Sequence, residues 1–209
     1  MPLYKTIAID EPTQVFVWKI TESFDQLFSE VALKDVSLAR LENMKSESHQ
    51  NAFLSVRKLL NEAGYSDFDL YYDEFGKPHL QDGTHISISH SHGFSVIVLS
   101  KVNVGADLEI LKDKTLKIAP RFMDISHLEN LNKEDALMKA TVVWGIKESV
   151  FKIKNEIGIS FKDHIFEDDF NLNDKKCGVA LRIEDKVERF DVVFDFIENY
   201  VFVCAFEKK

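Results

Sequence analysis

The chain has 209 residues and carries 35 Asp and Glu against 26 Lys and Arg, so its formal net charge is -9. A hydrophobic content of 45% can build a core, which excludes a fully disordered chain, and the length fits one large domain or two small ones. The acidic balance argues against sequence-independent binding of nucleic acid, which needs clustered basic residues. It leaves room for a small anionic ligand held by a few placed cations.

Membrane and redox features are sparse in this sequence. No run approaches the ~18 consecutive apolar residues of a membrane span, and the first twelve residues lack the apolar core of a secretory signal. Cys177 and Cys204 lie too far apart for a CxxC unit, and Cys204 stands in an apolar run that favours a buried free thiol. These features predict a soluble cytoplasmic protein.

The first half alternates strand and helix patterns. The β-branched run Val15–Ile20 predicts a strand, and Ser23 offers the N-cap of a helix that continues to Val31. Apolar positions from Leu38 to Leu60 predict one longer helical stretch that ends at Gly64. Strands are expected around residues 69–72, 85–89, 94–99 and 103–110.

The second half becomes helical from about Lys114 and β-rich towards its end. Asn132 is a good N-cap for a helix to about Lys154, whose apolar residues share one buried face. The tail predicts an antiparallel meander with strands at 178–183, 188–196 and 200–206. Because both halves run from helices into strands, we expect an α+β fold of two similar lobes, residues 1–100 and 101–209, each with an antiparallel sheet packed against helices.

The segment VGADLEI places two carboxylates on one face of a predicted strand. Asp107 and Glu109 are two residues apart, and side chains alternate along a strand. Gly105, just upstream, allows close backbone approach. An oxygen pair with no nearby His or Cys favours Mg²⁺ or Mn²⁺ over zinc. For this motif alone, an ordinary solvent-facing pair is the simpler interpretation.

The segment WGIKESVFK adds a carboxylate and a cation on one helix face. Glu148 and Lys152 are four residues apart, which is typical of a surface ion pair. The functional interpretation is a third metal carboxylate with a cation one turn away, ready to neutralise a phosphate. Lys147 points elsewhere on the helix and is expected in solvent.

The segment HISISHSHG brings hydroxyls and imidazoles together. If strand pairing ends near Ser89, then His90 and Ser91 lie at the strand exit, where they can meet the phosphates of a ligand. A three-histidine metal site is disfavoured, because the odd spacing scatters the side chains over two faces. A Ser–His nucleophile is possible, but no glycine elbow of the G-x-S-x-G type surrounds either serine.

The segment FGKPH is a turn in which Gly76 and Pro78 present Lys77. A lysine in such a turn is usually only solvated. The four motifs are weak one by one, but FGKPH, ISISHSHG, VGADLE and WGIKESVFK in this order resemble the signatures of the phosphopantetheinyl transferase superfamily, in its single-chain type with two similar lobes related by a pseudo-twofold. The resemblance covers about residues 53 to 161.

The resemblance implies an activity and a set of partners. Coenzyme A would be the substrate, and its phosphopantetheine arm would pass to a serine of an acyl or peptidyl carrier protein, with release of adenosine 3',5'-bisphosphate. The enzyme would need Mg²⁺, with Mn²⁺ as a substitute, and would act as a monomer. The implied residues are Asp107, Glu109 and Glu148 as metal ligands, Asp107, Glu148 and Lys152 as catalytic groups, and Arg57, Lys77, Pro78, Ser89, His90 and Lys152 as contacts to coenzyme A.

Departures from the family pattern keep an alternative open. Ser87 replaces the usual Asn, Gly145 replaces a small polar residue, and Gly158 alone remains of a usual glycine pair. Arginines often found upstream of Arg57 are also missing, which leaves the 3'-phosphate contacts undecided. The alternative is a non-catalytic protein that binds coenzyme A or a nucleotide on the same scaffold. A structural module whose acidic motifs are only surface is a third, weaker interpretation.

Overall fold

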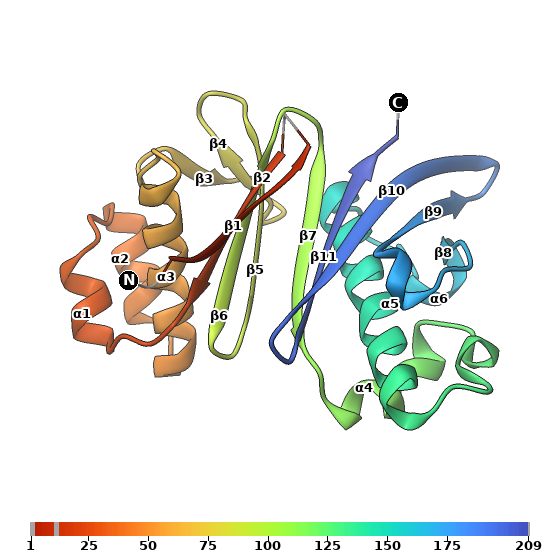
Figure 1. Ribbon diagram of the computed structural model, residues 1–209. Coiled ribbons are helices and arrows are strands. Elements are labelled where there is room, and N and C mark those ends of the chain that lie inside the picture. Colours follow the sequence, from red (N-terminus) through yellow and green to blue (C-terminus); the bar gives the residue numbers. More distant parts are fainter. Residues whose placement is uncertain (1–2, 11–12, 209) are drawn as a thin grey trace. The chain divides into compact units, whose positions relative to one another are not determined.

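A computed structural model describes residues 3–10 and 13–208, which belong to two compact units, Met1–Lys101 and Val102–Lys209 (Figure 1). Each unit combines an antiparallel sheet with helices, which confirms the predicted α+β class. Part of the N-terminal segment expected to lack a secretory signal, namely residues 1–2 and 11–12, lies outside the described residues. Within the described ranges, no helix is long and apolar enough to cross a membrane.

Unit 1 is built on a four-stranded antiparallel sheet with the order β1-β2-β6-β5. Its inner strands β2 and β6 are rich in β-branched and aromatic residues, which fit a pleated, buried surface. The pair β3-β4 is a separate hairpin around the FGKPH turn. The strands are β1 (Leu3–Asp10), β2 (Thr13–Lys19), β3 (Leu70–Tyr72), β4 (Pro78–Leu80), β5 (His85–Ser91) and β6 (Phe94–Ser100).

Unit 1 contains the helices α1 (Phe24–Ser29), α2 (Asp35–Glu42) and α3 (Glu47–Glu62). Ser23 caps α1 as predicted, although the helix ends before Val31. The expectation of one long helix up to Leu60 is wrong, because the chain leaves the helix after Glu42 and starts a new one at Glu47. The side chain of Asn43 donates to the carbonyl of Ala39 and so caps the end of α2.

A buried carboxylate joins α2, α3 and the loop before β3. Oδ1 of Asp67 accepts from Nε of Arg57 at 2.9 Å and from the hydroxyl of Ser37 at 3.0 Å. Its Oδ2 accepts from the backbone N–H of Lys34 at 3.0 Å. The side chains of Arg57 and Asp67 are 3% and 0% exposed. Because all donors converge on one carboxylate, Asp67 holds three segments of unit 1 together.

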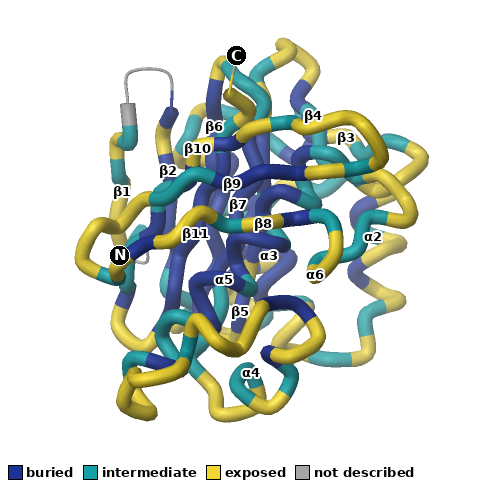
Figure 2. The backbone as a smooth tube through the Cα atoms, turned by 90° about the vertical axis from the view of Figure 1, so that its right-hand side faces the viewer, coloured by how far each residue is buried: buried dark blue, intermediate teal, exposed yellow. Residues whose placement is uncertain are grey.

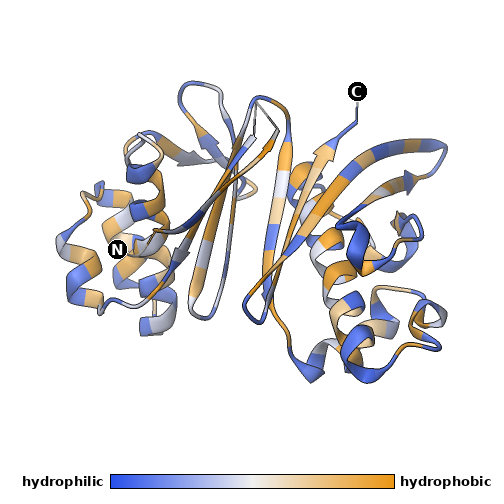
Figure 3. Cartoon of the chain, in the orientation of Figure 1, coloured by the Kyte–Doolittle hydropathy of each residue, from blue (hydrophilic) through white to orange (hydrophobic). Residues whose placement is uncertain are grey.

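Unit 2 is built on a five-stranded antiparallel sheet with the order β7-β11-β10-β9-β8. The predicted meander is confirmed. Apolar residues concentrate on the helix α5 and on the central strands (Figure 3), and β7 and β11 are buried for most of their length (Figure 2). The strands are β7 (Val104–Ile110), β8 (Ile165–Glu167), β9 (Lys176–Ile183), β10 (Lys186–Ile197) and β11 (Tyr200–Glu207), and the helices are α4 (Asp113–Ile118), α5 (Lys133–Lys154) and α6 (Phe161–His164), with 3₁₀ turns at Ala119–Arg121, Ile125–Leu128 and Leu172–Asp174.

The two units share part of their connectivity. In unit 1, β2 pairs with the last strand β6, which pairs with β5, and in unit 2, β7 pairs with the last strand β11, which pairs with β10. The long helix of each unit, α3 or α5, packs on the first and last of these strands. The two units thus share this pattern of pairing, and the pseudo-twofold relation of the lobes stays a prediction.

We expect Arg57→Ala to lower the free energy of unfolding by about 3–5 kcal/mol, because it leaves the Asp67 carboxylate buried without its guanidinium. Urea denaturation measures the change. The control is Lys58→Ala on the same helix, whose ion pair with the half-exposed Glu30 is worth about 0–1 kcal/mol. Equal losses for the two variants would contradict the role of the buried pair.

Candidate functional site

The site in unit 2 rests on an unusually close contact between α5 and two strands. A Cβ on Gly105 of β7 would stand 1.9 Å from the backbone oxygen of Ser149. A Cβ on Gly145 of α5 would stand 2.6 Å from Cγ2 of Val203 on β11. Both distances are too short for a side chain, so these glycines let the helix lie directly on the sheet. The close approach expected at Gly105 is therefore made by the backbone of α5.

The face of β7 that α5 covers carries the two predicted carboxylates. Asp107 and Glu109 follow Gly105 at alternate positions, so all three share this face. Nζ of Lys152 lies 2.9 Å from Oδ1 of Asp107 and donates to the carbonyl of Ala106 at 2.8 Å. Asp107 is 4% exposed. Lys152 therefore pairs with Asp107, across two elements, instead of forming only a surface pair along its own helix.

Trp144 also belongs to this site, although the sequence placed it only in the apolar stripe of α5. Its indole N–H donates to Oε1 of Glu109 at 3.3 Å. Its ring packs against Phe122 and Phe161, which fixes the direction of the indole. The signal for this role was the aromatic residue at the start of WGIKESVFK, since a buried indole N–H needs an acceptor.

The three carboxylates are close enough to disturb each other's ionisation. Burial and the charge of Asp107 raise the pKa of Glu109 to about 7. Burial and the charge of the same aspartate also raise the pKa of Glu148. The ammonium group of Lys152 opposes the rise in both glutamates, and both pKa values stay above their usual value. The cluster therefore concentrates negative charge that one lysine only partly offsets.

This donor set suits a hard divalent cation. Carboxylate oxygens are what Mg²⁺ prefers, and a cation would relieve the repulsion among Asp107, Glu109 and Glu148. Within residues 3–10 and 13–208, no group of three or more His, Cys, Asp or Glu side chains is already arranged to hold a metal ion. The chemistry of the three side chains thus fits Mg²⁺, and the metal-binding role of these residues remains a prediction.

In unit 1, the FGKPH turn is held by a carboxylate that lies two residues before the motif. Oδ1 of Asp73 accepts from the backbone N–H groups of Phe75 and Lys77 at 3.0 and 2.9 Å. Its Oδ2 lies 3.0 Å from Nε2 of His79, and this contact and the backbone donors lower the pKa of Asp73. Asp73 therefore fixes the turn that presents Lys77, next to the partly buried Pro78.

The strand that carries the serine and histidine motif is longer than expected. β5 continues to Ser91, which pairs with Phe94, so the expectation that pairing ends near Ser89 is wrong. The turn begins at His92, where φ is 50° and the chain reverses into β6. Along β5, Ser89 is buried and His90 is exposed, which places the two predicted ligand contacts on opposite faces of a paired strand.

Two basic residues occupy places that the sequence did not indicate. The guanidinium of Arg57 is paired with Asp67 in the core of unit 1, whereas the carboxylate cluster belongs to unit 2. Its contact with a 3'-phosphate stays a prediction. The expectation that Lys147 lies in solvent is wrong. Its side chain is 2% exposed and pairs with Glu167 of β8. Burial lowers the pKa of Lys147, and the charge of Glu167 opposes that effect.

Three curated proteins match this chain. It is 28% identical over 141 residues to "4'-phosphopantetheinyl transferase ffp" of Bacillus subtilis, which covers 63% of each chain. It is 31% identical over 83 residues to "4'-phosphopantetheinyl transferase gsp" of Aneurinibacillus migulanus, covering 38% of this chain and 35% of that protein. It is 29% identical over 140 residues to a "4'-phosphopantetheinyl transferase" of Bacillus subtilis, covering 63% and 60%.

No family model matches the chain. The chain spans less than two thirds of the length of the curated relatives that it matches. All three carry the name of the family that the motifs indicated, so the resemblance to the phosphopantetheinyl transferase superfamily is confirmed.

In metal-free protein, we expect the free energy of unfolding to fall by about 1–3 kcal/mol as the pH rises from 5 to 8. The folded state keeps the proton of Glu109 up to about pH 7, whereas an unfolded glutamate loses it near pH 4.5, so the folded form binds more protons in between. Urea denaturation in a chelator measures this dependence. Glu109→Gln should remove most of it, and an unchanged dependence in that variant would contradict the raised pKa.

Proposed function

We propose that this chain, which is similar to three curated 4'-phosphopantetheinyl transferases, transfers the 4'-phosphopantetheine arm of coenzyme A to a serine of an apo carrier protein, and that it does so as a cytoplasmic monomer. The serine oxygen would attack the phosphorus that bears the pantetheine. The bond from that phosphorus to the bridging oxygen of the pyrophosphate would break, and adenosine 3',5'-bisphosphate would leave. The serine proton would pass to a base of the enzyme.

The observation that supports this proposal most strongly is the meeting of Asp107, Glu109, Glu148 and Lys152 where α5 lies on β7. These four residues come from two motifs that are about 40 positions apart in the sequence. Phosphoryl transfer depends mainly on positioning and on neutralising charge, which a carboxylate cluster with one lysine can provide.

Each member of the cluster has a proposed role. Mg²⁺ bound by Asp107, Glu109 and Glu148 would neutralise charge on the pyrophosphate and on the departing bisphosphate. Lys152, whose side chain is 28% exposed, would hold Asp107 in place and face the phosphates with its ammonium group. The raised pKa of Glu148 makes it a stronger base for the serine proton, taken directly or through a water. Trp144 would orient Glu109.

The proposed nucleotide contacts lie in unit 1. Lys77 and Pro78 stand on the turn that Asp73 holds, and the exposed ring of His90 is more accessible than the buried hydroxyl of Ser89. For Arg57 to bind the 3'-phosphate, its guanidinium would have to turn from Asp67. This internal engagement is the observation that favours the alternative, a protein that binds coenzyme A or a nucleotide without transfer.

We expect mass spectrometry to show that an apo carrier protein gains one phosphopantetheine when incubated with this protein, coenzyme A and Mg²⁺. Lys152→Ala should lower the rate by about 10²-fold or more, because the cation at the phosphates is lost. Lys154→Ala is the matched control, since Lys154 lies two residues further along α5 and pairs with Glu188 at 2.9 Å, outside the cluster.

The same assay separates the proposals. No gain of mass on a panel of fatty-acid, polyketide and peptide carriers, with a folded enzyme, would exclude transfer to these carriers. Binding of coenzyme A without transfer would favour the non-catalytic alternative. Full activity in folded Asp107→Asn would remove Asp107 from the site.

We expect Mg²⁺ binding to be stronger at pH 8 than at pH 6, because the carboxylates must lose their protons before they bind the metal. With a pKa of about 7, Glu109 is mostly protonated at pH 6, so binding there should release close to one proton from this group. Titration calorimetry in two buffers of different ionisation enthalpy counts the protons released. A proton count of zero at pH 6 would contradict Glu109 as a ligand.

A further inference from the structure

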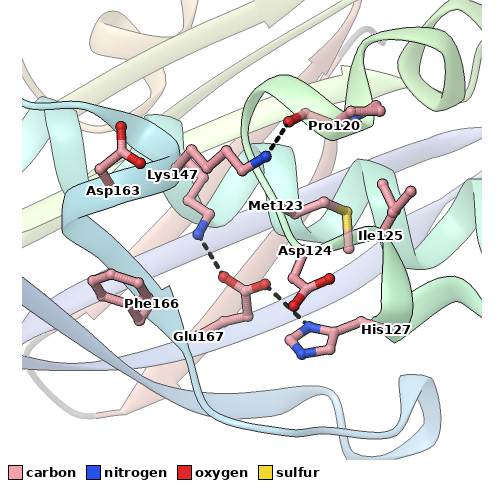
Figure 4. A pocket seen from close by; sticks show the side chains of 10 residues that line it. Pro120, Met123, Asp124, Ile125, His127, Lys147, Asp163, Phe166 and Glu167 are labelled. Atoms are coloured by element: carbon pink, nitrogen blue, oxygen red, sulfur yellow. Dashed lines mark hydrogen bonds and ion pairs between the residues drawn. The ribbon is translucent and has the colours of Figure 1, made fainter.

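Lys147 stands next to Glu148 in the sequence, yet the proposed chemistry does not use it. Its side chain points towards Glu167 of β8 (Figure 4). Nζ of Lys147 lies 2.5 Å from Oε2 of Glu167 and donates to the backbone oxygen of Ile165. The side chains of Lys147 and Glu167 are 2% and 5% exposed, so the pair is buried.

The Lys147–Glu167 pair and the two glycines all affect the position of α5. The glycines act where the helix meets β7 and β11, and the ion pair acts where it meets β8. Gly105 and Gly145 let α5 lie directly on β7 and β11, and the bonds of Lys147 tie the same helix to β8. Lys147 lies two residues after Gly145 and one before Glu148. The bonds from Lys147 to β8 therefore add a directional contact to the turn of α5 that carries Glu148.

Glu167 lies at the edge of a pocket in unit 2. The pocket is lined, among others, by Met123, Phe166 and His127 (Figure 4). Nδ1 of His127 lies 3.7 Å from Oε1 of Glu167, which is within ion-pair distance but too long for a hydrogen bond. Glu167 thus lies at the wall of a pocket, and Lys147 is its closest charged partner.

A buried ion pair adds little net stability compared with apolar side chains of the same size, because desolvation of the charges offsets their attraction. Such a pair can instead favour one relative position of the two elements that it joins, here α5 and β8. We propose that the Lys147–Glu167 pair is a positioning device, which fixes α5 so that Glu148 and Lys152 meet Asp107. This inference rests on the proposed transferase function, and Lys147 is a positioning residue in it, without contact to the substrate.

The test compares single and paired substitutions by apolar residues of similar shape. Lys147→Met alone leaves a buried carboxylate and should lower Tm, whereas Lys147→Met with Glu167→Met should restore Tm to near the unsubstituted value. In that double variant we expect kcat for transfer to fall by about 10²-fold, the effect of a misplacement of about 1 Å, with KM for coenzyme A changed by less than about threefold. The control pair is Lys154→Met with Glu188→Met, which breaks a more exposed ion pair of α5 and should leave kcat unchanged.

A second readout does not depend on activity. Amide hydrogen exchange of residues 145–152 should be faster in the Lys147/Glu167 double variant than in the unsubstituted protein at equal Tm, since the turn is no longer held to β8. A double variant with full kcat and unchanged exchange would overturn the positioning role. If the unsubstituted protein itself transfers nothing, the proposed function fails, and the exchange measurement alone then decides whether the pair holds α5.

Discussion

The charged cluster of unit 2 depends on the direct contact between α5 and the β7-β11 pair. Two glycines make this contact possible, because any side chain at Gly105 or Gly145 would overlap the backbone of Ser149 or the side chain of Val203. The same contact brings three carboxylates into a partly dehydrated space with one lysine. The raised pKa values of the two glutamates are its direct result. Such a concentration of like charge opposes folding, and it is the state that a divalent cation would stabilise.

Local sequence patterns were sufficient to predict most of the elements. The N-caps Ser23 and Asn132, the strand alternation of β7 and the final meander all depend on neighbours within a few residues. The same short range explains why Asp107 and Glu109 could be assigned to one face. The pairing of Asp107 with Lys152 could not be derived in this way, because it joins residues 45 positions apart through the packing of a helix on a strand.

The errors arose where a tertiary contact overrode a local preference. The break between α2 and α3 is an exception with a local cause: Met44 is the only apolar residue from Glu42 to Asn51, and the Asn43 side chain caps the end of α2. β5 extends two residues beyond Ser89 because β6 supplies partners up to Ser91. Arg57 lies on a helix whose sequence resembles the family. Its guanidinium nevertheless pairs with Asp67, ten residues later in a loop. Neither the amino-acid composition nor the spacing of apolar residues tells which distant side chain will pair with a given residue.

Lys147 and Lys152 show this limit most clearly. They lie five residues apart on one helix and have the same side chain, and the sequence assigned the first to solvent and the second to a phosphate. The structure gives each a carboxylate from a different strand, Glu167 of β8 for the first and Asp107 of β7 for the second. The side chains of the first pair are almost fully buried, whereas the lysine of the second keeps part of its surface exposed. That difference in solvent access, more than the identity of the residue, suits one lysine to hold the helix and the other to meet a ligand.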